Sequence, residues 1–268
     1  MVSKKELVKR MEEFEKAEKL NEHLDPTTFG NLIPVDKNYR YIHKGFKGNL
    51  KDILVRAFIQ WPFRKWWSIF FAHLKVKGKK NIKGVKHAVV VSNHCHIFDC
   101  GANITAFKGH KLYTVAASFN NFSGVLGDIM RAGRMLPLGE NTDSMKNFNL
   151  AIKEILTKKG YVLFYPEQAE WWLYKKPRPF MNGAFHYAVK HNVAIVPSFI
   201  TFKERKKLDK EGFHRQQFTV NILKPIYPDP NLNNRENLEM LKSKAFEAMK
   251  EKYEEVYKIP LKYSYEEV

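Results

Sequence analysis

Apolar residues recur at every third or fourth position over several stretches of the chain, a spacing that predicts amphipathic helices. Between these stretches lie short runs rich in β-branched and aromatic residues, which predict strands. The helices are expected at 143–158, 180–191 and 235–257, and the strands at 87–92, 112–116, 161–165, 193–198 and 218–223. Because strands and helices alternate along the chain, we expect an α/β fold with a mainly parallel sheet flanked by helices.

The pattern before this alternating region is different. Ser3 and Glu6 match a capping box at the start of an amphipathic first helix. A second amphipathic stretch, residues 50–74, is divided by Pro62, and a proline inside a helix removes a hydrogen bond and clashes with the preceding turn. This predicts an amphipathic helical hairpin. The chain is then expected to hold an N-terminal helix and linker at 1–49, the hairpin at 50–75 and an α/β domain at 76–268, packed as one compact unit.

Tryptophan and basic side chains alternate in the second half of this stretch. The uncharged run at 66–74 is far shorter than the ~20 residues that a membrane-spanning helix needs. Indole rings beside cations are typical of the lipid headgroup region, so we expect the hairpin to lie on a membrane surface. A core helix packed on the sheet is the alternative, because an apolar stripe is commonly buried. The residues expected at the membrane are Trp61, Arg64, Lys65, Trp66 and Trp67.

The charge balance narrows the range of partners. Lys and Arg number 46 against 28 Asp and Glu, which gives a formal net charge of +18. Such a charge attracts anionic lipid, nucleic acid or phosphorylated small molecules, and aromatic residues at 14% favour the lipid interface. The start of the chain is densely charged and has no apolar core typical of a secretory signal. We therefore expect a peripheral membrane protein at the cytoplasmic face, and with only two cysteines neither a disulfide framework nor a metal site.

Two ionisable residues follow the first strand predicted in the α/β domain. The run V-V-V-S at 89–92 is followed by His94, and Asp99 comes five residues later. On one continuous helix this spacing would place the two side chains about 140° apart, so they can meet only if His94 precedes a helix and Asp99 lies in its first turn. The carboxylate would then orient the imidazole and leave its other nitrogen to act as a base. A helix cap with a structural hydrogen bond is the alternative, and His96 is a second candidate for contact with Asp99.

Two sequence blocks resemble a known family. The run N-H-C-H-I-F-D at 93–99 is similar to the N-H-x4-D signature of the glycerolipid acyltransferases, the family of the lysophosphatidate acyltransferases. About seventy residues later, Y-P-E-Q-A-E at 165–170 resembles the family's F-P-E-G-T-R-S, in the same order and at a similar spacing. The resemblance covers roughly residues 86–225.

The resemblance implies a reaction and a set of roles. His94 would deprotonate the hydroxyl of a lysophospholipid or glycerol phosphate, which attacks a thioester carried by coenzyme A or acyl carrier protein, and Asp99 would orient His94. Glu167 would help to shape the acceptor pocket, and a helix N-cap is its structural alternative. No cofactor is expected, since the acyl-CoA or acyl carrier protein thioester is a co-substrate.

The sequence departs from the family where arginines are expected to contact the acceptor phosphate. The block G-x-x-F-I-D-R has only a loose counterpart at 133–139, without the arginine, and Glu170 stands in place of the arginine of the second block. Other cations could bind the phosphate, because a guanidinium can bind two of its oxygens, although a solvated basic surface is the alternative. The candidates are Arg131, Arg134, Lys175 and Arg178.

These observations predict a membrane-surface O-acyltransferase acting on a lysophospholipid in phospholipid synthesis. The missing arginines leave glycerol phosphate or a glycolipid as alternative acceptors. A basic module that binds anionic membrane or nucleic acid without catalysis is the alternative from another class, but no nucleic-acid motif is visible and nucleic acid is not expected as a partner.

Overall fold

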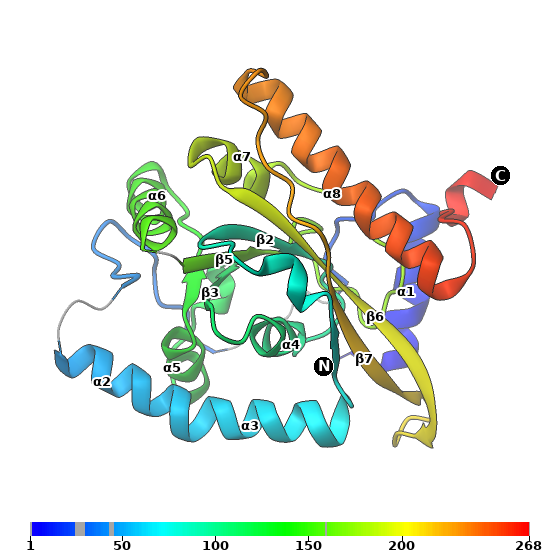
Figure 1. Cartoon of the computed structure of the whole chain (residues 1–268). Coiled ribbons are helices and arrows are strands. Elements are labelled where there is room, and N and C mark those ends of the chain that lie inside the picture. The colour runs from blue at the N-terminus through cyan, green and yellow to red at the C-terminus, as the bar shows by residue number, and fades with distance from the viewer. Residues whose placement is uncertain (1, 25–29, 43–45, 159, 268) are drawn as a thin grey trace.

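A seven-stranded sheet forms the centre of the protein (Figure 1). The structure is a computed structural model that describes residues 2–24, 30–42, 46–158 and 160–267. The strand order is β1-β7-β6-β2-β5-β3-β4. Strands β2 to β6 pair in parallel, as do β1 and β7, and among the described strands only β6 and β7 pair antiparallel, so the predicted mainly parallel sheet is confirmed. The strands are β1 (Lys75–Lys77), β2 (Ala88–Ser92), β3 (Lys111–Ala116), β4 (Met135–Pro137), β5 (Gly160–Phe164), β6 (Ala194–Leu208) and β7 (His214–Ile222).

Helices cover both faces of this sheet (Figure 1). One face packs under α6, α7 and α8, and the other under α4, α5 and the run that contains α2 and α3. Alternate residues of β2 enter the two cores, because side chains along a strand point to opposite faces: Val89 and Val91 to one, Val90 to the other. The helices are α1 (Lys4–Lys16), α2 (Phe46–Val55), α3 (Trp61–Trp66), α4 (Asp99–Ala106), α5 (Val125–Ala132), α6 (Thr142–Thr157), α7 (Gly183–Lys190) and α8 (Asn234–Tyr257).

The stretch predicted as a helical hairpin is instead one continuous helical run. It passes from α2 through a π-helical turn at Arg56–Gln60 into α3, and ends in a second π-helical turn at Trp67–Phe71. Pro62 lies in the first turn of α3, directly after a π-helical turn. At this position the missing N–H and the ring are tolerated, because π-helical turns shift the hydrogen bonding by one residue. The chain therefore does not reverse at Pro62.

The residues predicted at the membrane divide between the two sides of this run. Trp61 and Trp66 are about half exposed, at 49% and 47%, and the Lys65 ammonium lies 5.1 Å from the centre of the Trp61 ring. Trp67 is buried and packs against the rings of residues 96 and 98. Arg64 is half-buried against α4, where its side chain adjoins Gly101. Arg64 and Trp67 thus face the body of the protein, contrary to expectation, because consecutive helical positions point about 100° apart.

The two ends of the chain meet at Glu15 of α1. Its buried carboxylate accepts hydrogen bonds from the Tyr174 hydroxyl (2.7 Å), the Lys176 ammonium (2.6 Å) and the backbone N–H of Ser264 (2.8 Å). Figure 1 shows α1 beside the C-terminal segment. The loop at 167–178 is therefore held between an early and a late part of the chain.

Candidate active site

His94 and Asp99 meet where the chain leaves β2 and enters α4. His94 follows the strand by two residues, and Asp99 is the first residue of the helix. The Nδ1 of His94 lies 2.7 Å from Oδ2 of Asp99, whose side chain is buried, while the His94 side chain remains 24% exposed. The same oxygen accepts the backbone N–H of Cys95 at 3.0 Å. The predicted geometry is confirmed, and it leaves Nε2 as the ring nitrogen that can accept a proton.

Two opposing effects set the pKa of His94. Burial alone would lower it, because desolvation disfavours the imidazolium. The charge and the hydrogen bond of Asp99 outweigh burial, so the pKa of His94 is raised above its ordinary 6.5. The neutral imidazole that can act as a base is therefore fully populated only above that ordinary value.

His96, the second candidate for contact with Asp99, has a packing role. Its Nδ1 accepts the backbone N–H of Phe98 at 3.1 Å, and its ring contacts Phe218 with centroids 5.2 Å apart. Burial lowers the pKa of His96 to about 4. The ring that reaches the Asp99 carboxylate is that of His94.

Two residues that sequence reasoning did not assign hold His94 in position. The Tyr165 ring stacks on the His94 imidazole with centroids 4.1 Å apart and planes 19° apart. The side chain of Asn93 accepts the N–H of Ile200 (2.8 Å) and donates to its carbonyl (3.0 Å), so it extends the pairing between β2 and β6 by one step. Both positions belong to the two sequence blocks, and parallel strand ends meet at one edge of a sheet. The position of the two blocks at the ends of neighbouring strands is the sequence feature that could have indicated these two residues.

Glu167 and Arg178 form a fully buried ion pair beside His94. They are 1% and 0% exposed, and Nη2 of Arg178 lies 2.9 Å from Oε2 of Glu167. The same carboxylate oxygen accepts the backbone N–H of His94 at 3.1 Å, and Nη2 of Arg178 donates to the His94 carbonyl at 3.1 Å. Together the two side chains bind both polar groups of the His94 main chain.

This arrangement differs from the roles expected for the two residues. Arg178 also donates to the carbonyls of Leu20 and Ala169, and its guanidinium lies over the Trp171 ring, 4.7 Å from the ring centroid. Its guanidinium therefore binds protein groups in the interior rather than facing a ligand phosphate. Glu167 likewise uses both carboxylate oxygens on protein donors, because its Oε1 accepts the backbone N–H of Arg178 at 2.9 Å.

The other cations expected at the acceptor phosphate are spread over the molecule. Arg131 donates to the Asn121 side chain and the Phe122 carbonyl and pairs with Asp128 at 2.6 Å, so it anchors α5. The Arg134 guanidinium lies over the Tyr113 ring, at 5.6 Å. Lys175 lies over Tyr257 and 3.7 Å from Glu204 of β6. The structure does not bring these three side chains together beside His94.

A segment near the N-terminus packs on the loop that follows β5. The Asn21 side chain donates to the Glu167 carbonyl, and the Trp171 indole donates to the Glu22 carbonyl, each at 2.9 Å. His23 lies close enough to His94 for the two to interact: burial, and then the charge of His94, lower the pKa of His23. Residues 21–23 therefore contribute to the wall of the site.

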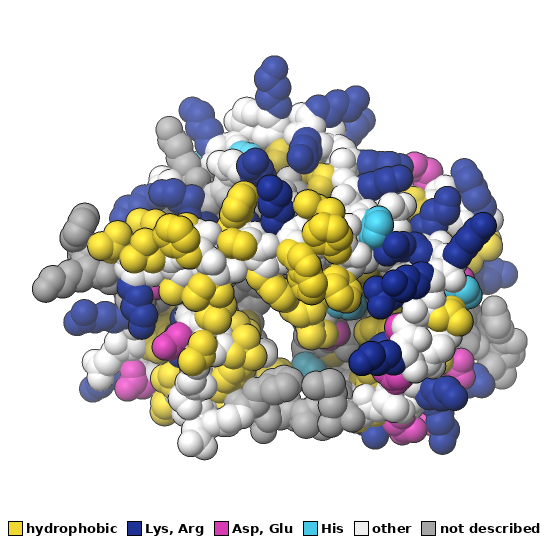
Figure 2. Space-filling view, turned by 90° about the horizontal axis from the view of Figure 1, so that it is seen from below, with side chains coloured by type: hydrophobic (Ala, Val, Ile, Leu, Met, Phe, Trp, Pro, Cys, Tyr) yellow, Lys and Arg dark blue, Asp and Glu magenta, His cyan; other side chains and the backbone are white. Residues whose placement is uncertain are grey.

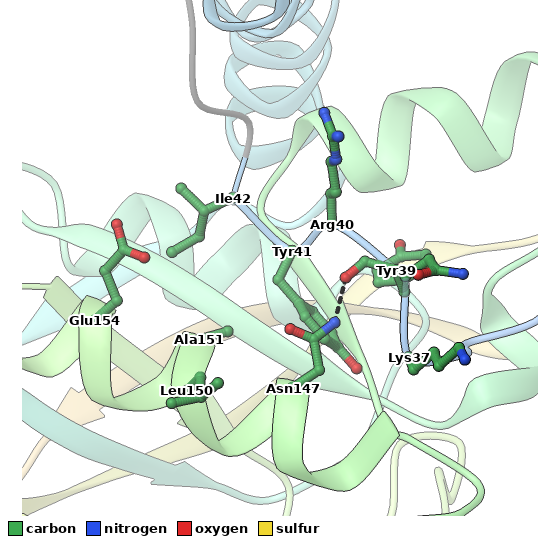
Figure 3. A pocket seen from close by; sticks show the side chains of 10 residues that line it. Lys37, Tyr39, Arg40, Tyr41, Ile42, Asn147, Leu150, Ala151 and Glu154 are labelled. Carbon is green, nitrogen blue, oxygen red and sulfur yellow. Dashed lines mark hydrogen bonds between the residues drawn. The ribbon is translucent and has the colours of Figure 1, made fainter. Parts of the chain in front are cut away.

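A pocket of about 530 Å³ lies elsewhere, between the segment 37–42 and α6 (Figure 3). Tyr41 and Ile42 face Leu150 and Glu154 across it, and the Asn147 amide donates to the carbonyl of Tyr39. Neither His94 nor Asp99 lines this pocket, so it is separate from the candidate active site.

Known proteins resemble the chain in sequence and in fold. Residues 73–201 match the family model named Acyltransferase. A 1-acyl-sn-glycerol-3-phosphate acyltransferase of Saccharomyces cerevisiae is 26% identical over 164 residues, 57% of this chain, and the chain spans about half (51%) of that relative's length. The crystal structure of the 1-acyl-sn-glycerophosphate acyltransferase of Thermotoga maritima superposes with a TM-score of 0.55 at 16% identity, covering 84% of this chain and 89% of the other, which shows a shared fold. Residues 73–201 are thus similar to the Acyltransferase family model, and both of these relatives are 1-acylglycerol-3-phosphate acyltransferases.

Proposed function

We propose that the protein transfers a fatty acyl group from a thioester of coenzyme A or acyl carrier protein to the hydroxyl of a monoacyl lipid, the class to which lysophospholipids and monoacyl glycolipids belong. The observation that carries this proposal is the 2.7 Å contact between His94 Nδ1 and Asp99, which fixes the imidazole with Nε2 available. The family match and the lysophosphatidate-type relatives support the reaction class.

The chemistry needs one base and no covalent intermediate on the enzyme. Nε2 of His94 takes the proton of the acceptor hydroxyl as its oxygen attacks the thioester carbonyl carbon. Asp99 stabilises the imidazolium that forms. When the tetrahedral intermediate collapses, the carbon–sulfur bond breaks and the imidazolium returns the proton to the departing sulfur. The products are an ester and a free thiol, and His94 is neutral again.

The experiment that tests the proposal follows the free thiol and the lipid product together. Purified protein would be supplied with acyl-CoA or acyl-loaded acyl carrier protein and a panel of lysolipids. We expect thiol release that depends on the acceptor, with a diacyl lipid as product. Thiol release that is equal with and without acceptors would show hydrolysis instead of transfer. Tight binding of anionic vesicles without any thiol release would favour the non-catalytic binding module.

The helical run at 46–71 supports action at a membrane surface, because its polarity is inverted. The side facing α4 and α5 carries polar groups: Arg56 donates to the Ala132 carbonyl and Gln60 to the Ile129 carbonyl, both at 2.6 Å. The outward side carries large apolar residues, and Figure 2 shows them gathered over this run with basic side chains around them. This outer face consists of Leu50, Ile53, Leu54, Phe58, Trp61, Phe63, Trp66, Ile69 and Phe70, each 41% to 74% exposed.

Such a face fits the boundary between lipid headgroups and acyl chains. Within the described residues, no helix has the length and apolar character to cross a bilayer. We therefore propose that the run lies along the surface, where its apolar side enters the lipid. The net charge of +18 would favour the anionic cytoplasmic leaflet, where the acceptor and the thioester donor can both reach His94.

Removing two outer-face rings is expected to weaken vesicle binding while leaving the fold intact. Phe58 and Phe70 are 74% and 61% exposed, so the double variant Phe58→Ser/Phe70→Ser loses apolar area that only the membrane would bury. We expect its affinity for vesicles containing anionic lipid to fall at least about tenfold in co-sedimentation, given about 1.5–3 kcal/mol for full burial of one such side chain. Ile259→Ser, a similar change at a 53% exposed site beyond α8, is the matched control. Equal binding by all three proteins would contradict the surface assignment.

The pH dependence of the reaction is expected to follow His94. Because Asp99 raises the pKa of His94 and only the neutral imidazole is a base, kcat/KM should fall as pH drops, with a midpoint above 6.5. Asp99→Asn removes the raising charge, so the midpoint should move to lower pH while the maximum rate falls about 10-fold or more, since the imidazole loses its orienting carboxylate. Rate profiles from pH 5 to 9 measure both effects. A midpoint that does not move in Asp99→Asn would assign the titration to another group.

A further inference from the structure

Glu170 is a carboxylate next to His94 and Asp99 in the fold, and none of the described residues forms a hydrogen bond or ion pair with its side chain. It lies between two buried residues, Ala169 and Trp171, and the backbone N–H of Trp171 donates to the His94 carbonyl at 3.0 Å. This bond fixes Glu170 next to His94. Its side chain is half-buried. Because protein donors do not take up its oxygens, this carboxylate can accept a hydrogen bond from a ligand.

The Glu170 carboxylate makes its surroundings unfavourable for an anionic group of a ligand. Burial raises the pKa of Glu170 to about 7; His94 and Arg178 lower it, whereas Asp99 raises it. The carboxylate is thus ionised in part at neutral pH, and a phosphate placed beside it would repel the ionised form. The same position holds arginine in the family block F-P-E-G-T-R-S, so the sign of the charge is reversed here.

The Arg178 guanidinium acts on this position by its charge, but its hydrogen bonds are taken up by protein groups. The Arg178 guanidinium is fully buried and bonds to Glu167 and to the carbonyls of Leu20, His94 and Ala169. Burial lowers the pKa of His23, which also lies near His94, and so disfavours its charged form. The surroundings of the reacting hydroxyl therefore provide a hydrogen-bond acceptor in place of a phosphate-binding cation.

A neutral hydroxyl group is the ligand group that fits beside Glu170 both before and after His94 takes up the proton. A hydroxyl can donate a hydrogen bond to the Glu170 carboxylate whether His94 is neutral or protonated. A cationic headgroup would instead lie beside the imidazolium that forms when His94 takes the proton, and would destabilise it. A phosphate monoester would face the unpaired carboxylate throughout.

Resting on the acyl transfer proposed above, the geometry points to Glu170 as a specificity-determining residue. It selects an acceptor whose headgroup next to the reacting hydroxyl is uncharged and rich in hydroxyls, as in a monoacyl glycolipid, and it rejects a phosphate monoester such as lysophosphatidate. Its carboxylate accepts a hydrogen bond from a headgroup hydroxyl and so orients the acceptor on Nε2 of His94.

The test compares kcat/KM for three acceptors of equal acyl chain length: a monoacyl glucosylglycerol, lysophosphatidylethanolamine and lysophosphatidate. Wild type is expected to prefer the glycolipid over lysophosphatidate at least about tenfold, because a hydrogen-bonding group left unpaired weakens binding. Glu170→Gln should lower the ratio of kcat/KM for glycolipid over lysophosphatidate. Glu170→Arg should reverse the preference, because the guanidinium can bind the phosphate. Glu239→Gln, on the exposed side of α8, is the matched control and should leave the ratio unchanged.

The outcomes separate this inference from the proposed reaction. A wild-type preference for lysophosphatidate, or for lysophosphatidylethanolamine over both other acceptors, would overturn the role of Glu170. The same ratio of kcat/KM for glycolipid over lysophosphatidate in wild type, Glu170→Gln and Glu170→Arg would also overturn it. Absence of thiol release with every acceptor would refute the proposed reaction. In that event, titration of the same lysolipids in neutral micelles against wild type and Glu170→Arg still decides the inference, because equal relative affinities in the two proteins would overturn it.

Discussion

Replacing His94 with alanine is expected to lower kcat/KM for acyl transfer by about 10²- to 10⁴-fold, the contribution of a well-placed general base. The side chain is 24% exposed, and within the described residues its Nδ1 bonds to Asp99 alone, so its loss removes the proton acceptor without opening the core. The measurement is thiol release with a saturating thioester donor and varied acceptor. The affinity for the donor should change little, because the base acts on the acceptor.

His186→Ala is the matched control for this substitution. His186 is exposed on α7, on the other face of the sheet from α4, and we expect wild-type turnover and thermal stability from this variant. If His94→Ala keeps wild-type turnover, the base assignment is wrong. If its thermal midpoint falls while the residual rate per folded molecule is normal, the His94–Asp99 contact is structural.

The second large effect is expected on stability, from the buried pair of Glu167 and Arg178. Arg178→Met removes the cation and leaves the Glu167 carboxylate, 1% exposed, without its charge partner. Breaking such a pair from one side is expected to lower the free energy of unfolding by about 3–5 kcal/mol. The double variant Glu167→Gln/Arg178→Met should recover part of this loss, because a neutral amide can still accept the His94 N–H and no charge remains buried.

Urea unfolding followed by circular dichroism measures this loss, with a surface ion pair as the control. The side chains of Lys146 and Asp143 are 70% and 63% exposed, and Nζ of Lys146 lies 3.0 Å from Oδ1 of Asp143. Lys146→Met should therefore change the free energy of unfolding by at most about 0.5 kcal/mol. If Arg178→Met and Lys146→Met lower the free energy of unfolding by comparable amounts, burial of the Glu167–Arg178 pair does not matter for stability. We also expect a lower kcat in Arg178→Met, since the guanidinium binds the His94 carbonyl.

The strand ends and the catalytic pair could be predicted from the sequence because they depend on local order. Valine-rich β2 followed by polar residues places His94 beyond a strand, and the five-residue spacing to Asp99 requires a strand-to-helix junction. By contrast, the partners of Glu167 depend on the path of a loop that returns eleven residues later with Arg178. The periodicity of the sequence does not show where this loop goes, so the sequence predicts a ligand contact for Arg178, which lies in the interior.

The helical run at 46–71 shows a second limit of pattern reading. Helical spacing shows that one face is apolar, but it cannot tell whether that face points inward or outward. Here the inward face carries Arg56 and Gln60, whose hydrogen bonds to α5 replace apolar packing. Trp66 and Trp67 are neighbours of the same type, yet one is exposed and the other buried. Only the position of α4 and α5 decides between them.

The meeting of distant chain segments at Glu15 has a consequence for protein synthesis. The loop that supports His94 rests on Leu20 and Glu15, which are translated before it, and Glu15 in turn accepts the N–H of Ser264, which is translated 249 positions after Glu15. A chain still emerging from the ribosome therefore contains His94 and Asp99 long before the loop beside them has its full support. Acylation by such a nascent chain is expected to begin only after translation has passed this late segment, when the contacts between distant residues can close.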